Sequence, residues 1–130
     1  MILSFAWTAE AFISGRKKRT RRDWDETYAA FFKPGIVHRG YNRSPRVGGH
    51  SIGNFTVPHY PRKGNTADMT EEDYELEGFA YMEEHGLMIP ARRVNQISLP
   101  AVSPREFFEN WKRSAIDLFV VDFNKIEEMI

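Results

Sequence analysis

Glycine and proline turns divide this chain into short apolar segments, a pattern that favours short strands with a few helices between them. The first segment, Met1–Ala6, is an apolar run that predicts a buried strand. A short helix over 9–14 follows, because Thr8 can cap its start and Gly15 supplies a left-handed end. Ten Phe, five Tyr and three Trp among 130 residues favour a β-rich or α+β domain over a leucine-rich helical bundle.

Further strands are predicted over 18–24, 36–41, 51–57 and 118–123, with a helical turn over 25–32 and a loop over 58–66. These segments fit an α+β fold in which short helices pack on a small, partly open β-barrel. We expect a single domain over 1–130, since a chain of this length allows one ordinary core. In that barrel one sheet would hold the strands that contain Leu3, Ile36, Phe55 and Val121.

Two helices in the second half have clear start signals. Thr70 and Asp73 form a capping box that predicts a helix through about Glu84, ended by Gly86. The sequence Ser103-Pro104-Arg105-Glu106 supplies an N-cap serine, a proline at the first helical position and a glutamate at the third. The helix that follows would place Phe107 or Phe108 on one face with Trp111 and Ala115.

Several classes of protein are excluded by composition. The chain has no cysteine, which rules out disulfides, Cys-ligated zinc, iron–sulfur clusters and thiol nucleophiles, and fits a reducing compartment. No apolar run approaches the ~18 residues of a membrane helix, and the basic cluster follows the apolar start, the reverse of a secretory signal. The four histidines have no metal-ligand spacing. We therefore expect a soluble cytoplasmic protein without a membrane partner, metal site or cofactor.

The net charge of zero hides an asymmetry between the two halves. Residues 1–63 hold 12 Lys and Arg against 4 Asp and Glu, whereas residues 64–130 hold 6 against 14. The split can mean a basic binding surface opposite an acidic face, or two halves that pair inside one fold. Six of the seven residues in 16–22 are basic. This run is either a solvated edge strand or a site for phosphate groups.

The run also carries a family resemblance. Ile2-Leu3-Ser4-Phe5, a short helix and then Gly15-Arg16-Lys17-x-x-Thr20-x-Arg22-Asp23 resemble the opening of the ASCH domain, which is related to PUA domains and has a PUA-like β-barrel. Later matches, in the family's order, are Lys33-Pro34-Gly35, Glu77-Gly78-Phe79 and Phe107-Phe108-x-x-Trp111. The resemblance covers nearly the whole chain.

What the resemblance implies is a cleft beside the Lys/Thr strand that binds RNA or a nucleotide. One bacterial branch consists of amidohydrolases that remove acetate from N4-acetylcytidine. Their catalytic residues fall on Lys17 as base, Thr20 as nucleophile and Glu77 as acid. Other members are described as ribonucleases. The chain differs from the common pattern at Lys18, where a threonine often stands, and has a longer loop region around 44–63.

The geometry of such a cleft sets two conditions. Side chains alternate along a strand, so Lys17 and Thr20 share a face only if Lys17 lies in the turn after Gly15. Glu77 must point into the same space, within roughly 3–6 Å of Lys17. On a continuous helix Tyr74 and Tyr81 would flank Glu77, raise its pKa by partial desolvation and offer a stacking surface.

A second candidate surface lies in 39–46, where arginines alternate with an aromatic residue and turn residues. Bases can stack on Tyr41 while Arg43 holds phosphate, although a hairpin with a charged tip has the same pattern. The candidate residues for binding RNA or another ligand are Arg16, Lys18, Arg19, Arg21, Arg22, Tyr41, Arg43 and Tyr74.

These observations predict an ASCH-type domain that binds RNA or a nucleoside or nucleotide, modified or not. The alternatives are an amidohydrolase that acts on N4-acetylcytidine and a ribonuclease. The sequence does not indicate an oligomeric state.

Overall fold

A four-stranded sheet contains the start of the chain. The structure, a computed structural model, describes residues 1–127. The sheet order is β1-β3-β4-β9, and only β1 and β3 run parallel. Its strands are β1 (Ile2–Ser4), β3 (His38–Tyr41), β4 (Ser51–Thr56) and β9 (Asn124–Lys125). The strands predicted over 36–41 and 51–57 are thus present, with slightly shorter bounds.

A second, antiparallel sheet has the order β2-β8-β5. It consists of β2 (Arg19–Arg22), β5 (Arg62–Asn65) and β8 (Asp117–Asp122). The central strand β8 is buried on both faces, from Leu118 to Val121. The loop prediction for 58–66 was therefore wrong at β5. That strand has no apolar side chain, and it is defined by its backbone pairing with β8.

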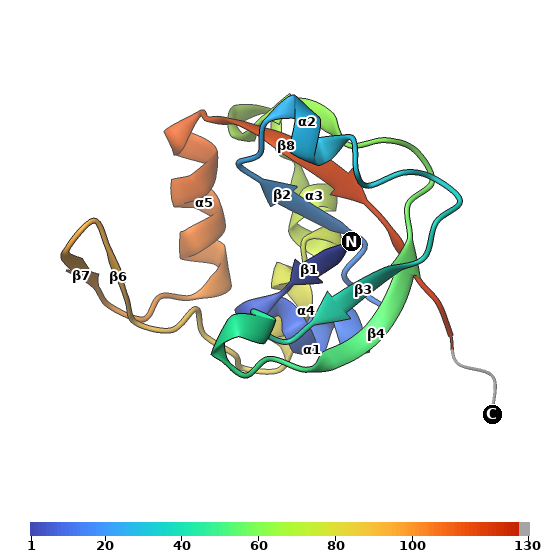
Figure 1. The fold of residues 1–130 in the computed structure, drawn as a ribbon. Coiled ribbons are helices and arrows are strands. Elements are labelled where there is room, and N and C mark those ends of the chain that lie inside the picture. Colours follow the sequence, from blue (N-terminus) through green and yellow to red (C-terminus); the bar gives the residue numbers. More distant parts are fainter. Residues whose placement is uncertain (128–130) are drawn as a thin grey trace.

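The two sheets share a core. Phe123 lies between β8 and β9, so one continuous segment passes from the second sheet into the first (Figure 1). Eight buried side chains from both sheets and the adjoining segments form this core: Leu3, Phe5, Phe12, Phe32, Phe55, Val57, Val121 and Phe123.

The pairings correct the expectation of one barrel-like sheet. Leu3 and Phe55 belong to the first sheet, Val121 belongs to the second, and Ile36 lies outside the strands. Among residues 1–127 the strand pairings close no barrel, and the fold is mixed α+β with several sheets.

Short helices surround the sheets and carry a second core. They are α1 (Ala9–Ile13), α2 (Glu26–Ala29), α3 (Glu71–Leu76), α4 (Phe79–Glu84) and α5 (Pro104–Ser114), with 3-10 turns at η1 (Ala6–Thr8), η2 (Pro45–Val47) and η3 (Thr66–Asp68). Residues of α3, α4 and α5, with Met69 and Ile89, pack into a cluster of Met, Tyr, Phe and Ile side chains. None of the helices in residues 1–127 is long and apolar enough to cross a membrane.

The capping signals in the second half are confirmed. The Ser103 side chain accepts a hydrogen bond from the Glu106 N–H at 3.1 Å, and the Thr70 N–H donates to Asp73 Oδ2 at 2.8 Å. The helix predicted from Thr70 to Glu84 is, however, two helices. Gly78 separates α3 from α4 with a φ of +100°, a conformation that glycine adopts without strain.

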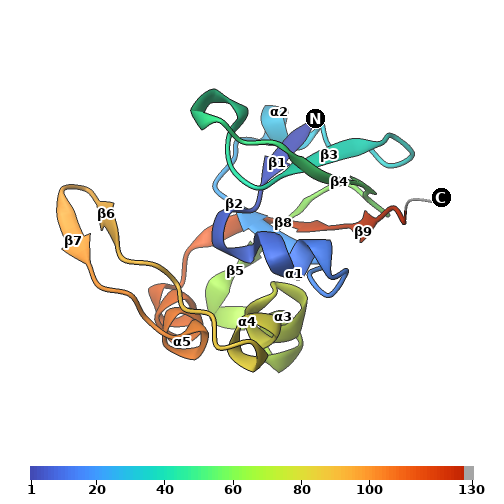
Figure 2. The same ribbon diagram turned by 90° about the horizontal axis from the view of Figure 1, so that it is seen from below.

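A hairpin that sequence reasoning missed extends from the helical side. Strands β6 (Arg92–Val94) and β7 (Ile97–Leu99) pair across Asn95 and Gln96, which both have positive φ. Figure 2 shows this hairpin projecting away from both sheets, next to α5.

Candidate functional site

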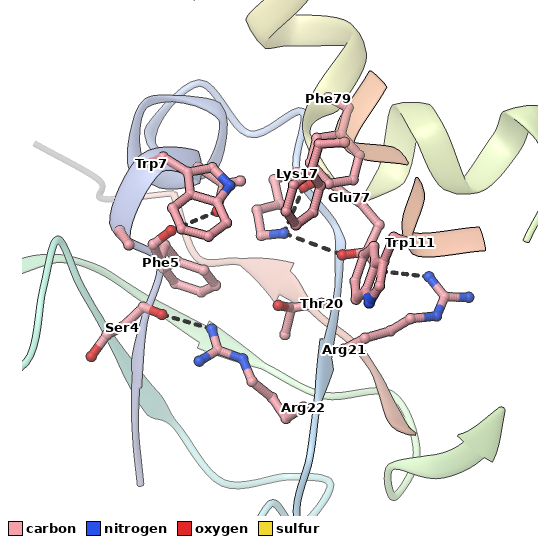
Figure 3. A pocket seen from close by; sticks show the side chains of 13 residues that line it. Ser4, Phe5, Trp7, Lys17, Thr20, Arg21, Arg22, Glu77, Phe79 and Trp111 are labelled. Atoms are coloured by element: carbon pink, nitrogen blue, oxygen red, sulfur yellow. Dashed lines mark hydrogen bonds and ion pairs between the residues drawn. The ribbon is translucent and has the colours of Figure 1, made fainter. Parts of the chain in front are cut away.

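A cavity of about 300 Å³ lies where β1, β2, the α3–α4 junction and α5 meet. Figure 3 shows Lys17, Thr20 and Arg22 around the space between Trp7 and Trp111. The residues that line the cavity are Ser4, Phe5, Ala6, Trp7, Thr8, Lys17, Thr20, Arg21, Arg22, Glu77, Phe79, Phe107 and Trp111. The structure thus brings Lys17, Thr20 and Glu77 together, although they come from separate elements.

The position of Lys17 meets the first geometric condition. Gly15 leaves α1 with a φ of +83°, and β2 begins only at Arg19, so Lys17 lies in the connecting turn. Its backbone N–H donates to Ala11 at 3.1 Å. This turn frees Lys17 from strand alternation and lets it face the cavity together with Thr20.

Lys17 and Glu77 form a buried ion pair. Lys17 Nζ lies 3.7 Å from Glu77 Oε1, and the two side chains are only 2% and 3% exposed. The same Nζ donates to the carbonyl oxygens of Glu77 at 2.6 Å and Arg19 at 2.9 Å. Burial lowers the pKa of Lys17 to about 8, against the attraction of Glu77 and together with the repulsion of Arg22.

The end of α3 determines where Glu77 points. Glu77 is the C-cap of α3, and its carbonyl faces Lys17 because Gly78 turns the chain there. A Cβ on Gly78 would lie 2.9 Å from the Cβ of Ala11 and 3.5 Å from that of Lys17, so only glycine allows this close approach. Arg21 Nη1 donates to Glu77 Oε2. Burial raises the pKa of Glu77, and the cations Lys17 and Arg21 oppose the rise without cancelling it.

Thr20 occupies the centre of β2. Thr20 pairs with Val121 of β8, is only 5% exposed, and lines the cavity. Arg22, two residues along the strand, also lines the cavity and donates from Nη2 to the carbonyl of Ser4 at 2.6 Å. This bond joins the end of β2 to the end of β1.

The aromatic walls are formed by residues that sequence reasoning had not assigned to the cleft. Trp7, Phe79, Phe107 and Trp111 line the cavity, and their rings contact one another: Trp7–Phe107 at 5.7 Å and Phe107–Trp111 at 5.9 Å between centroids. Phe79, Phe107 and Trp111 belong to the motifs quoted for the family resemblance. The roles of Phe107 and Trp111 in the site were missed because the periodicity of the 104–114 helix indicated only that they share one face.

Neither Tyr74 nor Tyr81 lines the cavity, so the predicted stacking surface beside Glu77 is not formed by them. The break at Gly78 ends the helical spacing from Glu77 to Tyr81, whereas Tyr74 keeps its helical spacing to Glu77 but does not line the cavity. Tyr74 is buried in the helical core, with the Arg105 guanidinium 3.8 Å above its ring, and burial raises its pKa to about 12. Tyr81 lies against His85 at a centroid distance of 4.1 Å.

The basic run pairs with acids of the second half. Arg16 is bonded to Glu75 and Glu84 of the acidic helices. Lys18 is exposed. The charge asymmetry is thus resolved largely in favour of two halves that pair inside one fold.

Arg19 and Arg21 continue this pairing. Both contact Asp73 Oδ1 at 2.8 Å, and Arg19 also contacts Asp122. Burial would raise the pKa of Asp73, but the Thr70 N–H and the two guanidinium groups lower it to about 2. These arginines hold the acidic helix against the sheet rather than form an open surface for a polyanion.

Tyr41 and Arg43 lie apart from the cavity lining. Tyr41 ends β3, pairs in register with Ser4 and is partly exposed. Arg43 is exposed in the following loop, where its guanidinium reaches the carbonyl of Gly48 at 3.5 Å. The site therefore does not bring these two residues together with Lys17, Thr20 and Glu77.

Comparison with known proteins gives no assignment: no family model matches the chain, and neither a curated protein nor a solved structure matches it.

Proposed function

We propose that this chain is a single ASCH-type domain with a PUA-like fold, and that its cavity binds the base of a nucleoside, nucleotide or RNA. The observation that carries the proposal is the convergence of Lys17, Thr20 and Glu77 on one cavity with aromatic walls. These are the three positions to which the ASCH resemblance assigns the site. The passage of one segment from β8 into β9, across the shared core, is compatible with a partly open barrel.

The size and chemistry of the cavity support a base as the ligand. A volume of about 300 Å³ suits a small planar group rather than a folded partner. Trp7 and Trp111 offer π-faces on which a base can stack, which contributes about 1–3 kcal/mol per base in nucleic-acid-binding proteins. Thr20 and Glu77 supply hydrogen-bonding groups for its edge.

Electrostatics favour the electron-rich edge of a base. Lys17, Arg21 and Arg22 line the cavity with one carboxylate, Glu77. With Lys17 protonated, the lining carries an excess of positive charge, and burial strengthens its effect on a carbonyl oxygen of the ligand. Two other cations of the basic run, Arg16 and Arg19, are held in ion pairs, so a long polyanion gains less from the run than the sequence indicates.

Intrinsic fluorescence tests base binding directly, because Trp7 and Trp111 line the cavity. We expect cytidine or N4-acetylcytidine to quench the emission with saturation, and Trp111→Ala to weaken binding by about 10-fold or more. Trp24→Phe is the matched control, since Trp24 stacks on Phe32 in the core of the sheets and does not line the cavity. A protein that binds no nucleoside, nucleotide or RNA would contradict the proposal.

A second candidate function is amidohydrolysis of N4-acetylcytidine. It is favoured by the lowered pKa of Lys17 and the raised pKa of Glu77 in a cavity that contains a threonine. Thr20 Oγ1 would attack the acetyl carbonyl carbon while Lys17 Nζ takes its proton, and Glu77 would protonate the departing N4. Water would then hydrolyse the acetyl ester on Thr20, releasing acetate and regenerating the hydroxyl.

Base binding is the first proposal because of the contacts of Lys17. A protonated lysine has three N–H bonds, and Nζ has three protein oxygens in reach: two carbonyls and Glu77 Oε1. In that arrangement it has no lone pair for Thr20. Catalysis requires a neutral Lys17 that is released from at least one of these oxygens.

Acetate release from N4-acetylcytidine distinguishes the two functions. If the protein is an amidohydrolase, Thr20→Val abolishes turnover while retaining shape, and Thr20→Ser restores part of it because the hydroxyl returns. Turnover that survives in Thr20→Val excludes Thr20 as the nucleophile. Saturable binding with no acetate release by the wild type leaves the binding domain as the function.

A further inference from the structure

A second cavity, of about 410 Å³, lies between α5 and the segment that carries the β6–β7 hairpin. It holds none of the residues that the sequence indicated for a site. Its lining is Arg92, Leu99, Pro100, Val102, Glu106, Phe107, Asn110, Trp111 and Ser114. In Figure 2 the hairpin projects beside α5, away from the sheet that contains β2.

The two cavities share a wall. Phe107 and Trp111 line both of them, one on each turn of α5. A base that stacks against these rings in the first cavity would be separated from the second cavity by one layer of side chains. The two cavities are therefore neighbours on the same face of α5.

Arg92 is a cation without a charged partner among the described residues. Its guanidinium carbon lies 5.2 Å from the Phe107 ring centre and 5.9 Å from that of Trp7, and Nη1 is buried without a hydrogen bond. Glu106 lines the same cavity but is exposed and forms no ion pair with Arg92 within residues 1–127. Arg16 and Arg19, by contrast, each contact two carboxylates.

The segment that carries the hairpin has no acidic residue, although Glu106 of α5 also lines the cavity. Residues 85–105 contain no Asp or Glu, and they include Arg92 and Arg93. Asn110 and Ser114, one turn apart on α5, add polar groups opposite the hairpin. A stacked arginine beside polar side chains is suited to a phosphate group, which a guanidinium can bind through two parallel N–H bonds.

We propose that the second cavity binds the phosphate of a nucleotide whose base occupies the first cavity, with Arg92 as the principal donor. The ligand is then a nucleoside phosphate, free or within a strand, rather than a free nucleoside. This inference rests on the proposed function, since it requires a base in the first cavity. Rings on one side of the guanidinium restrict its orientation before the ligand arrives.

Fluorescence titration of the full chain with cytidine, its 5′- and 3′-monophosphates and a cytidine-containing dinucleotide tests the proposal. We expect a phosphate-bearing probe to bind about tenfold tighter than cytidine or more, and Arg92→Gln to remove most of that gain. Arg93→Gln is the matched control: Arg93 is the exposed neighbour on the same strand and bonds only to the Gln96 carbonyl in the described residues. The dinucleotide distinguishes an internal phosphate from a terminal one.

Each other outcome has a separate meaning. Equal affinity for cytidine and every phosphate-bearing probe overturns the phosphate subsite and leaves base binding intact. Equal losses for nucleoside and nucleotide in Arg92→Gln assign Arg92 to the support of Trp7 and Phe107 instead, and also overturn it. Equal effects of Arg92→Gln and Arg93→Gln would show that the tighter binding of phosphate-bearing probes comes from the overall positive charge of the hairpin, and would overturn the phosphate subsite. Binding of no probe at all contradicts the proposed function itself.

Discussion

Because Lys17 is buried, the free energy of unfolding should increase as the pH rises into the alkaline range and this lysine loses its proton. Its ammonium group has an ordinary pKa of 10.5 in the unfolded chain, and burial lowers this pKa to about 8 in the folded protein. The difference corresponds to about 3 kcal/mol against the folded state wherever Lys17 is protonated in both states. Between the two pKa values the unfolded chain binds the extra proton, so the stability rises with pH. From pH 7 to 9.5 the rise due to Lys17 is about 2 kcal/mol.

Urea unfolding followed by tryptophan fluorescence measures this rise when the wild type is compared with Lys17→Met. The variant lacks the titrating group, so the difference between the two pH profiles isolates Lys17 from other groups that titrate there. We expect the wild type to gain about 2 kcal/mol over the variant between pH 7 and 9.5. Parallel profiles would refute the reasoning, because they would show that Lys17 keeps an ordinary pKa in solution.

The partner carboxylate sharpens the same test. The negative charge of Glu77 raises the pKa of Lys17 and partly opposes the effect of burial. Glu77→Gln should therefore lower this pKa further, and the increase in stability should begin at a lower pH. At pH 7 the added cost through Lys17 is limited to less than about 2 kcal/mol, because a fully neutral lysine costs about 5 and the wild type already bears about 3. Glu75→Gln is the matched control, since Glu75 is partly exposed and pairs with Arg16. An alkaline rise unchanged by Glu77→Gln would contradict the contact.

Three further predictions concern stability. Gly78→Ala should cost at least about 2 kcal/mol in urea unfolding, because φ is +100° and the new Cβ would lie 2.9 Å from that of Ala11. Ala115→Gly should instead add about 1 kcal/mol, since Ala115 ends α5 with a φ of +50°, and a lower melting temperature would contradict this. Asp73→Asn should cost about 2 kcal/mol near pH 7. The stability that this carboxylate contributes is present above its ordinary pKa of 3.8 and disappears as the pH falls through about 2. The free energies of unfolding of the wild type and Asp73→Asn should therefore converge in acid, and a constant difference would contradict the lowered pKa.

Much of the secondary structure could be predicted because the signals are local. The N-cap of α5 at Ser103, the capping box at Thr70 and the end of α1 at Gly15 all depend on hydrogen bonds or φ angles within a few residues. The strand β5 could not be predicted in this way. Its residues have no apolar pattern, and its backbone pairs with β8, whose residues lie about 55 positions further along the chain.

The candidate site divides in the same manner. The sequence motif placed Lys17, Thr20 and Glu77 in one site, and the 3.7 Å contact of Lys17 with Glu77 lies within the predicted range. The predicted aromatic flank does not line the cavity: Gly78 breaks the helical spacing between Glu77 and Tyr81, and Tyr74, although it lies on α3 with Glu77, packs into the helical core. Sequence reasoning treated Gly78 as part of a helix, although glycine is a poor residue for a helix interior.

The sequence by itself determined the starts of α3 and α5, the end of α1, the strands β1 to β4 and β8, and the residue types available to the site, because each depends on neighbours along the chain. Only the tertiary structure decided what the charges do. In the sequence, Arg19 and Arg21 belong to a basic run that could bind anions. In the structure they donate hydrogen bonds to Asp73, some fifty residues away. Arg92 carried no signal, yet its guanidinium lies beside the Phe107 ring, and its Nη1 is buried without a hydrogen bond. Charge is a property of residue type, whereas pairing is a distance between atoms, and only folding sets that distance.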